Sequence, residues 1–466
     1  AEAARKAKEL IRMAVVRVVK GQPVKIDTIE PIPEVLVLGG GVAGMTAALE
    51  LANAGLGVTL VEKTDQLGGI VRRKYYLVEG QDPQQYVQSL VNQVQKHARI
   101  KVLTNTRLVS QSGRPGRFRS VLRHEDNGAS EEFALEHGAT VLAIGGLPYA
   151  GPEYMLGQHP QAVSQLELER ILAEEPTRAK GWKQVVMIQC VGRDEAPHSP
   201  CSRICCTGAV GNALKIKELN PACQVYVLYR DVMTYGPREA YYTAAREQGV
   251  LFVRYEPAEK PAVSADSRGL VVTVRERTLN ETLELHPDLL ALSTVTQPAP
   301  DVADVAWRLG LPLSPEGFFQ EAHSKMRPTE FVKPGVYVAG LAHYPKFIED
   351  SVAQAKAVSA QVMQWLVHGP VQVGGLVAEV NQERCVGCLT CVRICPYHAP
   401  SIDYSVPGIG GIMGAAYIDP ARCQGCGLCT AECPNKAIQL YGYHDDALMD
   451  PAMPVLGRWE VPSPAA

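Results

Sequence analysis

The sequence predicts an α/β protein with two parallel-sheet domains, followed by a small α+β domain rich in cysteine. Three observations predict this class. Strand-like and helix-like runs alternate from Glu34 onward, the pattern of a parallel sheet covered by helices. One cysteine spacing occurs twice after Gly374 and Gly375, where the composition changes. The length of 466 residues also gives room for two to four domains.

Composition and charge exclude several classes of protein. The chain is 46% hydrophobic and 20% charged with a formal net charge of −3, so neither nucleic acid nor an anionic membrane is an expected partner. No apolar run is long enough to span a bilayer, and we find no secretory signal, so we expect a cytoplasmic protein without direct membrane insertion. The sequence opens with Ala1 rather than Met, which leaves open whether residues precede it.

The 13 cysteines point to metal sites rather than to disulfides. None precedes Cys190, and most of them fall in two dense groups. Secreted disulfide scaffolds are usually far shorter than this chain. Close cysteine spacings in a long chain instead indicate metal ligands in a reducing cytoplasm.

Residues 2–20 have the pattern of an amphipathic helix. We expect a linker or docking helix here. A membrane-surface helix is the alternative, but no second anchoring signal accompanies it. Gly21 and the prolines that follow end the helix. Its basic residues are Arg5, Lys6, Lys8, Arg12, Arg17 and Lys20, and its apolar residues are Leu10, Ile11, Val15, Val18 and Val19.

The run VLVLGGGVAGMTAALELANAGLGVTLVEK reads as strand, glycine turn, helix, strand and acid. This is the pattern of a dinucleotide site, in which the phosphates meet free N–H groups at the helix N-terminus and the acid binds ribose hydroxyls. The alternative is a glycine turn in an α/β protein that binds no ligand. The expected binding residues here are Gly39, Gly41, Val42, Ala43, Gly44, Glu62 and Lys63.

Three further segments resemble flavoproteins with two dinucleotide domains, of the thioredoxin-reductase and glutamate-synthase small-subunit type. Leu67–Gly69 resembles their flavin-side loop, Thr140–Gly146 their return strand, and Pro334–Gly340 the late strand that places the ribityl chain. The resemblance implies FAD rather than NAD as the bound dinucleotide. It adds as expected FAD contacts Gly68, Gly69, Leu108, Ala143, Gly145 and Gly340.

The resemblance also sets the expected domain limits. We expect an N-terminal helix and linker over 1–32, an FAD domain formed by 33–149 and 288–368, and a second nucleotide-like domain over 150–287. A ferredoxin domain follows over 375–444, and 445–466 is expected to be an extended tail. The strand-like runs are Val35–Leu38, Val58–Val61, Thr140–Ile144, Val185–Gln189, Val225–Tyr229 and Val336–Ala339, and Ser351–Leu366 is helix-like.

The second domain carries cysteines where a nicotinamide loop is expected. The strand Val185–Gln189 runs into CVGRDEAPHSPCSRICC, which has no GxGxxG. Four thiolates can surround one iron–sulfur cluster; a redox disulfide, structural zinc and buried free cysteines remain the alternatives. The candidate ligands are Cys190, Cys201, Cys205 and Cys206.

This segment, together with LYRDVMTYG and EAHSKMRPTEFVKPGVYVAGLAHYPKFIEDSVAQA, resembles the A-type subunit of heterodisulfide reductase and its bacterial relatives. The resemblance implies that the four cysteines bind a [4Fe–4S] cluster near the flavin. Longer family members carry an extra N-terminal domain and an inserted ferredoxin module. The segment GGIVRRKYYLVEGQDPQQYVQSL contains no cysteine, so this chain resembles the shorter relatives.

The C-terminal cysteines show the spacing of a bacterial ferredoxin with two [4Fe–4S] clusters. In that arrangement the fourth cysteine of each run binds the other cluster. With the central group, this makes three [4Fe–4S] clusters, and Cys223 is left over as an expected buried thiol. One ligand set is Cys385, Cys388, Cys391 and Cys433, and the other is Cys395, Cys423, Cys426 and Cys429.

Three other residues have a functional and a structural interpretation. The resemblance favours Lys346 beside the flavin ring, where its charge would stabilise reduced flavin and act as the tuning residue of the site; a solvent-facing loop lysine is the alternative. Asp350 either caps the following helix or contacts the flavin. His323 either contacts flavin or a partner or, more in keeping with its surroundings, serves a structural role.

The expected function is that of an oxidoreductase component that distributes electrons inside a multisubunit complex, in which the chain could also dimerise. The resemblance implies flavin-based electron bifurcation or its reverse. The partners it implies are a donor-side oxidoreductase, ferredoxin or another low-potential carrier, and heterodisulfide-reductase B- and C-like subunits. The alternatives are a non-bifurcating component of a quinone-linked complex and an autonomous NAD(P)H oxidoreductase.

Overall fold

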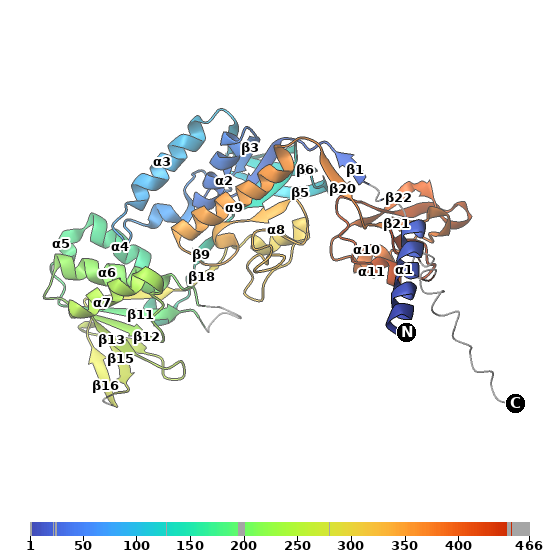
Figure 1. The fold of residues 1–466 in the computed structure, drawn as a ribbon. Coiled ribbons are helices and arrows are strands. Elements are labelled where there is room, and N and C mark those ends of the chain that lie inside the picture. Colours follow the sequence, from blue (N-terminus) through green and yellow to red (C-terminus); the bar gives the residue numbers. More distant parts are fainter. Residues whose placement is uncertain are drawn as a thin grey trace.

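The computed structural model describes residues 2–21, 23, 26–126, 128–193, 201–278, 280–444 and 449. The second α/β domain is inserted in the first, and a small cysteine-rich domain follows them in the chain. The second α/β domain and the cysteine-rich domain lie on opposite sides of the first (Figure 1). The α/β class with an appended α+β domain is confirmed. The expected tail over 445–466 lies outside the described residues except for 449.

The first α/β domain is built on a parallel sheet with the strand order β19-β8-β2-β3-β4. Its strands are short runs of buried aliphatic residues, as expected where both faces of a parallel sheet are covered. Helices α2 and α9 pack against each other on one face. The bounds are β2 Glu34–Leu38, β3 Gly57–Val61, β4 Ile100–Leu103, β8 Ala139–Leu142, β19 Val336–Val338, α2 Val42–Asn53, α3 Pro83–Lys96 and α9 Ile348–Leu366.

An antiparallel sheet, β5-β6-β7, and helix α8 complete this domain and share a second apolar core with the parallel sheet. Sequence reasoning did not predict this sheet. The bounds are β5 Thr106–Arg114, β6 Arg117–Asp126, β7 Ala129–His137 and α8 Val302–Leu309.

The second α/β domain repeats this topology with the order β10-β17-β11-β12-β13. Strand β11 therefore corresponds to β2, and the loop from β11 to α6 corresponds to the glycine turn from β2 to α2. An antiparallel sheet, β14-β15-β16, packs against one face of this parallel sheet and shares an apolar core with it. The bounds are β10 Ala162–Ser164, β11 Gln184–Val191, β12 Gln224–Tyr229, β13 Leu251–Arg254, β14 Ala262–Asp266, β15 Gly269–Glu276, β16 Glu281–Leu285, β17 Leu289–Thr294, α4 Gln165–Glu174, α5 Pro176–Ala179, α6 Cys205–Leu219 and α7 Glu239–Glu247.

The structure corrects one domain limit. The sequence predicts that the second domain ends at residue 287, but β17 pairs with both β10 and β11 and so lies inside the second sheet. The two domains are joined instead through β9 (Gly146–Pro148) and β18 (Thr296–Pro298), which pair antiparallel. The limit therefore falls between β17 and β18.

The cysteine-rich domain contains two small antiparallel sheets and two short helices. Before it, strand β1 (Ile26–Ile29) pairs antiparallel with β20 (Val371–Gly374), so the segment expected to be a linker ties the N-terminus to the entry of this domain. The other bounds are β21 Ala378–Val380, β22 Pro400–Pro407, β23 Met413–Ile418, β24 Ile438–Leu440, α10 Thr390–Ile394 and α11 Leu428–Ala431.

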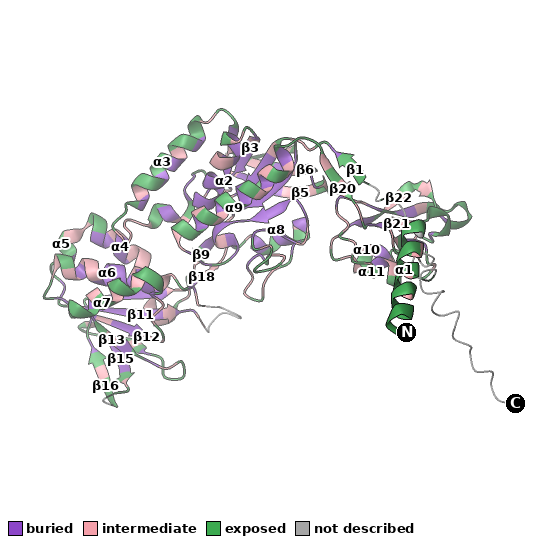
Figure 2. Ribbon diagram, viewed as in Figure 1, coloured by how far each residue is buried: buried purple, intermediate pink, exposed green. Residues whose placement is uncertain are grey.

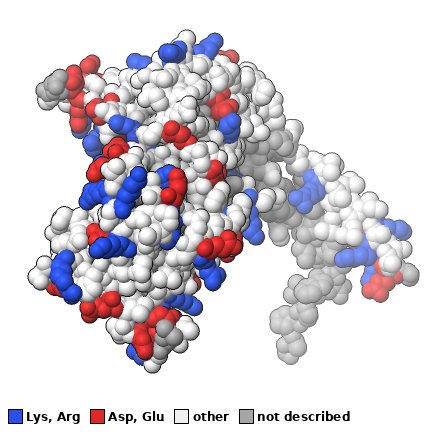
Figure 3. Space-filling view, turned by 90° about the vertical axis from the view of Figure 1, so that its left-hand side faces the viewer, with Lys and Arg blue, Asp and Glu red and all other residues white. Residues whose placement is uncertain are grey.

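Helix α1 (Glu2–Lys20) confirms the predicted N-terminal helix, and its apolar side is exposed, in contrast to the buried strands of both α/β domains (Figure 2). Among the described residues, no helix combines the length and apolar character needed to cross a membrane. Basic and acidic side chains are interspersed over the face that Figure 3 shows.

Candidate functional site

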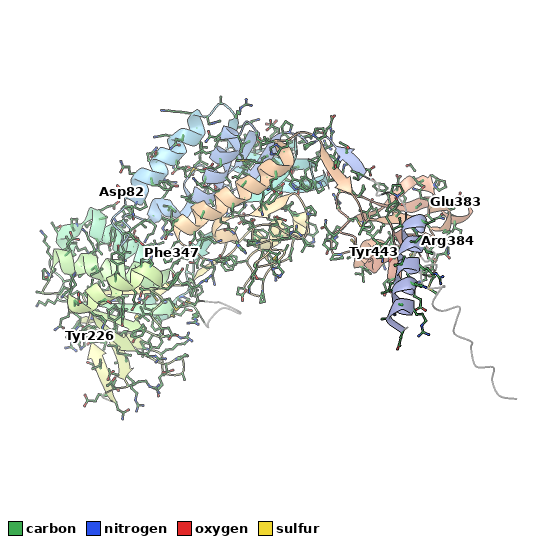
Figure 4. All side chains as sticks on the ribbon, viewed as in Figure 1. Asp82, Tyr226, Phe347, Glu383, Arg384 and Tyr443 are labelled. Carbon is green, nitrogen blue, oxygen red and sulfur yellow. The ribbon has the colours of Figure 1, made fainter. Side chains whose placement is uncertain are left out.

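A cavity of about 600 Å³ lies between the two α/β domains and is lined by residues from both. We call it the interdomain cavity. From the first domain it takes the glycine turn after β2, the end of β3 and the start of α9, and from the second domain it takes the N-terminus of α6. Figure 4 places Phe347, one of the lining residues, at this junction. The volume lies within the range of ordinary ligand pockets.

The glycine turn after β2 shows why each glycine is needed. Gly39 has φ +109°, and a Cβ there would lie 2.2 Å from the carbonyl oxygen of Ala143. A Cβ at Gly44 would lie 1.9 Å from the carbonyl oxygen of Gly39, so any side chain would separate α2 from the turn. A Cβ at Gly41 would meet no protein atom within 4 Å. Gly41 therefore leaves the interdomain cavity open at the N-terminus of α2.

Glu62 lies at the end of β3 with its carboxylate held in place at the interdomain cavity. The backbone N–H of Gly40 donates to one carboxylate oxygen at 2.7 Å, and the backbone N–H and hydroxyl of Thr64 both donate to the other at 2.9 Å. Lys63 beside it pairs with Asp301 at 2.6 Å. A fixed carboxylate here suits the hydroxyls of a ribose.

Most of the other predicted dinucleotide contacts also reach the interdomain cavity. Gly44 packs behind the turn. Leu108 lies in the apolar core, and neither it nor Asp350 lines the cavity. Asp350 instead accepts the backbone N–H of Phe347, the N-cap residue of α9, and this helix begins three residues earlier than expected. The predicted residues that line the cavity are Gly39, Gly41, Val42, Ala43, Glu62, Lys63, Gly68, Gly69, Ala143, Gly145, Gly340 and Lys346.

Lys346 is 5% exposed, and two side chains contact its ammonium group. Its ammonium donates to Gln354 and lies 3.9 Å from the centre of the Tyr344 ring. The Arg203 guanidinium, from the cysteine loop of the second domain, lies 5.2 Å from the same ring centre. Burial lowers the pKa of Lys346 to about 7. His323, in contrast, is exposed and accepts backbone N–H groups of its own turn, which is a structural role.

The structure brings the four central cysteines together. Cys190 is the next-to-last residue of β11 and has φ +62°, and Cys205 and Cys206 are the first residues of α6. Burial and the nearby Cys206 and Cys201 raise the pKa of Cys190 to about 11. A hydrogen bond from Cys205 lowers the pKa of Cys206 to about 7. Cys205 also lines the interdomain cavity, so this group adjoins the cavity from the side of the second domain.

The C-terminal cysteines surround two separate cavities, and each cavity takes cysteines from both runs. Backbone N–H groups also point at sulfur: Ala416 N lies 3.3 Å from Cys385 Sγ, and Ala378 N lies 3.4 Å from Cys423 Sγ. Such hydrogen bonds tune cluster potentials. One cavity is lined by Cys385, Cys388, Cys391 and Cys433, and the other by Cys395, Cys423, Cys426 and Cys429.

This placement is the crossed pattern of the predicted ligand sets, and thiolate donors fit [4Fe–4S] clusters. The left-handed glycines that turn the loops, Gly387 at φ +65° and Gly427 at φ +75°, lie beside the cysteines. Cys223 is buried and stands apart from these groups, as expected. Among the residues that the structure describes, no three His, Cys, Asp or Glu side chains are placed to hold a single metal ion.

The pyridine nucleotide-disulphide oxidoreductase family model matches residues 33–355, and the 4Fe-4S dicluster domain model matches residues 369–437. The A-type iron-sulfur subunit of the CoB–CoM heterodisulfide reductase of Methanocaldococcus jannaschii is 30% identical, and the match covers 85% of this chain and 74% of that protein. The chain belongs to the family of A-type heterodisulfide reductase subunits. A relative in Methanopyrus kandleri, the second of its two A-type subunits, is 31% identical over 86% of this chain and 74% of that protein.

The predicted resemblance to the A-type subunit of heterodisulfide reductase is thereby confirmed, as is the oxidoreductase class. Both family models imply cofactors, FAD for the first and [4Fe–4S] clusters for the second. The thioredoxin reductase of T. acidophilum covers 71% of this chain and 98% of its own length at 15% identity and a TM-score of 0.49.

Sequence reasoning missed several residues around the interdomain cavity. Gln354 accepts hydrogen bonds from Lys346 and from the backbone N–H of Gly340, and Arg238 reaches across from the second domain to Glu79 and Glu349. Because Gln354 is one of several polar residues on α9, no sequence signal distinguishes it. Arg238 follows a glycine and a proline, which are typical of a turn but do not indicate a contact with the first domain.

Proposed function

We propose that this member of the heterodisulfide reductase family distributes electrons between an FAD in the interdomain cavity and three [4Fe–4S] clusters. The observation that carries the proposal is the position of Cys205, which lines the same cavity as Gly41, Glu62 and Lys346 while lying among Cys190, Cys201 and Cys206. A cluster held by these thiolates would adjoin the flavin.

Bound FAD supplies the chemistry of taking up two electrons together and releasing them one at a time. The chain's own residues would hold and tune it. The N-terminus of α2 and the open face of Gly41 suit a pyrophosphate, and the Glu62 carboxylate suits a ribose. The Lys346 ammonium would favour negative charge on the ring, and the cysteine groups would carry single electrons away.

The sequence of the second α/β domain supports a role in electron transfer rather than in binding a nicotinamide dinucleotide. Its loop from β11 to α6 occupies the position of the glycine turn from β2 to α2, but it holds cysteines instead of a GxGxxG. A nicotinamide dinucleotide would lack its phosphate turn there. An autonomous NAD(P)H oxidoreductase is therefore less favoured. A component of a quinone-linked complex is less favoured because the similar proteins are named as subunits of CoB–CoM heterodisulfide reductase.

The finer proposal is electron bifurcation or its reverse in a cytoplasmic multisubunit complex. The relative in Methanothermobacter marburgensis is 28% identical over 86% of this chain and 74% of that protein, and it is named as the A-type subunit of an H(2):CoB-CoM heterodisulfide,ferredoxin reductase. By analogy, a donor protein would deliver two electrons. One would pass toward B- and C-like subunits and the other toward ferredoxin.

Anaerobic rapid mixing tests the proposed function. We expect reduced ferredoxin to bleach the flavin absorbance of the purified, fully loaded protein, and NADH or NADPH to leave it unchanged on the same timescale. Rapid reduction by NADPH would overturn the proposed electron route. A redox titration tests bifurcation separately, because a single two-electron wave for the flavin supports it and two well-separated one-electron waves contradict it.

A further inference from the structure

A chain of hydrogen bonds runs behind the wall of the interdomain cavity from Glu321 to Lys346. His343 Nε2 lies 2.9 Å from Glu321 Oε2, and His343 Nδ1 lies 2.8 Å from Gln354 Nε2. Gln354 Oε1 accepts the backbone N–H of Gly340 at 3.0 Å and a hydrogen bond from Lys346 Nζ. Gly340 and Lys346 line the cavity, so the chain of hydrogen bonds ends at the cavity wall.

The contacts fix the orientation of the Gln354 amide. A backbone N–H and an amine both donate, so the amide oxygen has to face Gly340 and Lys346. The amide nitrogen then faces His343 and donates to Nδ1. The proton of the neutral imidazole is therefore on Nε2, where it is donated to the Glu321 carboxylate. One histidine tautomer satisfies every member of the hydrogen-bond chain.

A second proton on His343 is incompatible with this arrangement. Protonated Nδ1 would be a donor facing the amide nitrogen, which is also a donor. Rotating the amide would present the oxygen to His343 but turn its nitrogen toward Gly340 N–H and Lys346. Lys346 would then lose its acceptor at the cavity wall.

From this geometry we propose that Gln354 is a positioning residue that holds the Lys346 ammonium at the flavin and that the protonation state of His343 controls this hold. The inference rests on the proposed binding of FAD in the interdomain cavity. Neutral His343 keeps Lys346 hydrogen-bonded to Gln354, and protonated His343 releases Lys346 from this hydrogen bond.

The charges around His343 and Lys346 determine the pH range in which Lys346 is released. Burial lowers the pKa of His343, the hydrogen bond to Glu321 opposes this shift, and the charge of Lys346 adds to it. Around Lys346, burial is opposed by Asp350 and Glu321 and assisted by Arg203. Because the pKa of His343 lies below its ordinary value near 6.5, release is expected only in acid, and Lys346 is held at neutral pH.

The first test replaces Gln354 by leucine in the fully loaded protein and measures the flavin midpoint potential at pH 6.5, where Lys346, with its pKa of about 7, is mostly protonated. We expect the potential to fall by at least the equivalent of a tenfold change in equilibrium constant, about 30 mV for a two-electron couple. Gln361→Leu is the matched control on the same helix, since Gln361 bonds Thr329 and Glu330 rather than Lys346. An unchanged potential in Q354L, or an equal shift in Q361L, would overturn the proposal.

The second test uses His343→Gln, because a glutamine can accept from Gln354 and donate to Glu321 but cannot take up a proton. We expect H343Q to have the wild-type potential at pH 7.5. Below pH 6.5 the wild-type potential should depart from a straight line against pH, and H343Q should stay on the line. A break retained in H343Q would contradict the role of His343. FAD content, measured by absorbance, separates these outcomes from a failure of FAD binding itself.

Discussion

Replacing Gly41 by alanine should weaken FAD binding while leaving the fold intact. Gly41 is the N-cap of α2 with φ −76° and ψ −178°, an extended conformation that any residue adopts. A Cβ at this position meets no protein atom within 4 Å and would project into the space proposed for the pyrophosphate. The substitution therefore acts on the ligand and not on the protein.

The magnitude follows from the contact that would be lost. A hydrogen bond to a charged group contributes about 1.5–3 kcal/mol. Losing one should raise the FAD dissociation constant by roughly ten- to 150-fold, since each 1.4 kcal/mol is a factor of ten. The apoprotein should unfold within a few degrees of the wild type, because the gain of about 0.4–1 kcal/mol from Gly→Ala at a compatible backbone conformation is opposed by alanine being a poorer N-cap residue than glycine.

The assay is titration of FAD into apoprotein followed by flavin fluorescence, with a thermal melt of the apoprotein beside it. Gly181→Ala is the matched control, because its Cβ would meet only the carbonyl oxygen of Arg178 at an ordinary 3.6 Å. Gly44→Ala should fail differently, by lowering the melting temperature through its 1.9 Å contact with Gly39. Unchanged FAD affinity in G41A would refute the assignment of this turn as the phosphate site.

Two further predictions concern buried basic residues. Burial lowers the pKa of His137 to about 4, so the free energy of unfolding of the first domain should be highest above pH 6.5 and should fall by about 3 kcal/mol as the pH falls to 4. Denaturant melts should show this loss of stability, and in His137→Asn the stability should depend less on pH over the same range. Burial lowers the pKa of Lys333 to about 8, and the charge of Arg422 in the cysteine-rich domain adds to the shift. Below pH 8 the buried charge of Lys333 destabilises the folded protein, and this cost is relieved as the pH rises toward 10.5. Limited proteolysis between the first α/β domain and the cysteine-rich domain should therefore become slower over that range. In Lys333→Met the proteolysis should be slow at every pH.

Local patterns predicted the parts of the site that are formed by neighbouring residues. The glycine turn, Glu62 and the strands β2 and β3 could be predicted because each depends on residues within one strand–helix–strand unit. The crossed cysteine sets could be predicted because the doubled spacing is specific. The structure groups the same cysteines around two cavities.

The remaining features depend on contacts between distant segments. Strand β17 is a short apolar run without a glycine motif, so its place in the second sheet could be recognised only from its pairing with β11. The hydrogen bond between Glu321 and His343 joins a loop to the turn before α9. Both residues lie in the segment that carries the family resemblance, but nothing in that segment indicates that the two side chains meet. For the same reason no local pattern indicated that Arg203 and Lys346 share the Tyr344 ring.

The four cysteines at and before the N-terminus of α6 are proposed to hold a third cluster beside the flavin, and the metal content of the protein tests this most directly. Iron, acid-labile sulfide and FAD should be quantified on anaerobically prepared protein. We expect about twelve irons per FAD, four for each of three clusters, and about eight in Cys201→Ser with the FAD content unchanged. A wild-type value of about eight would contradict the third cluster and make Cys190, Cys201, Cys205 and Cys206 candidates for a redox disulfide.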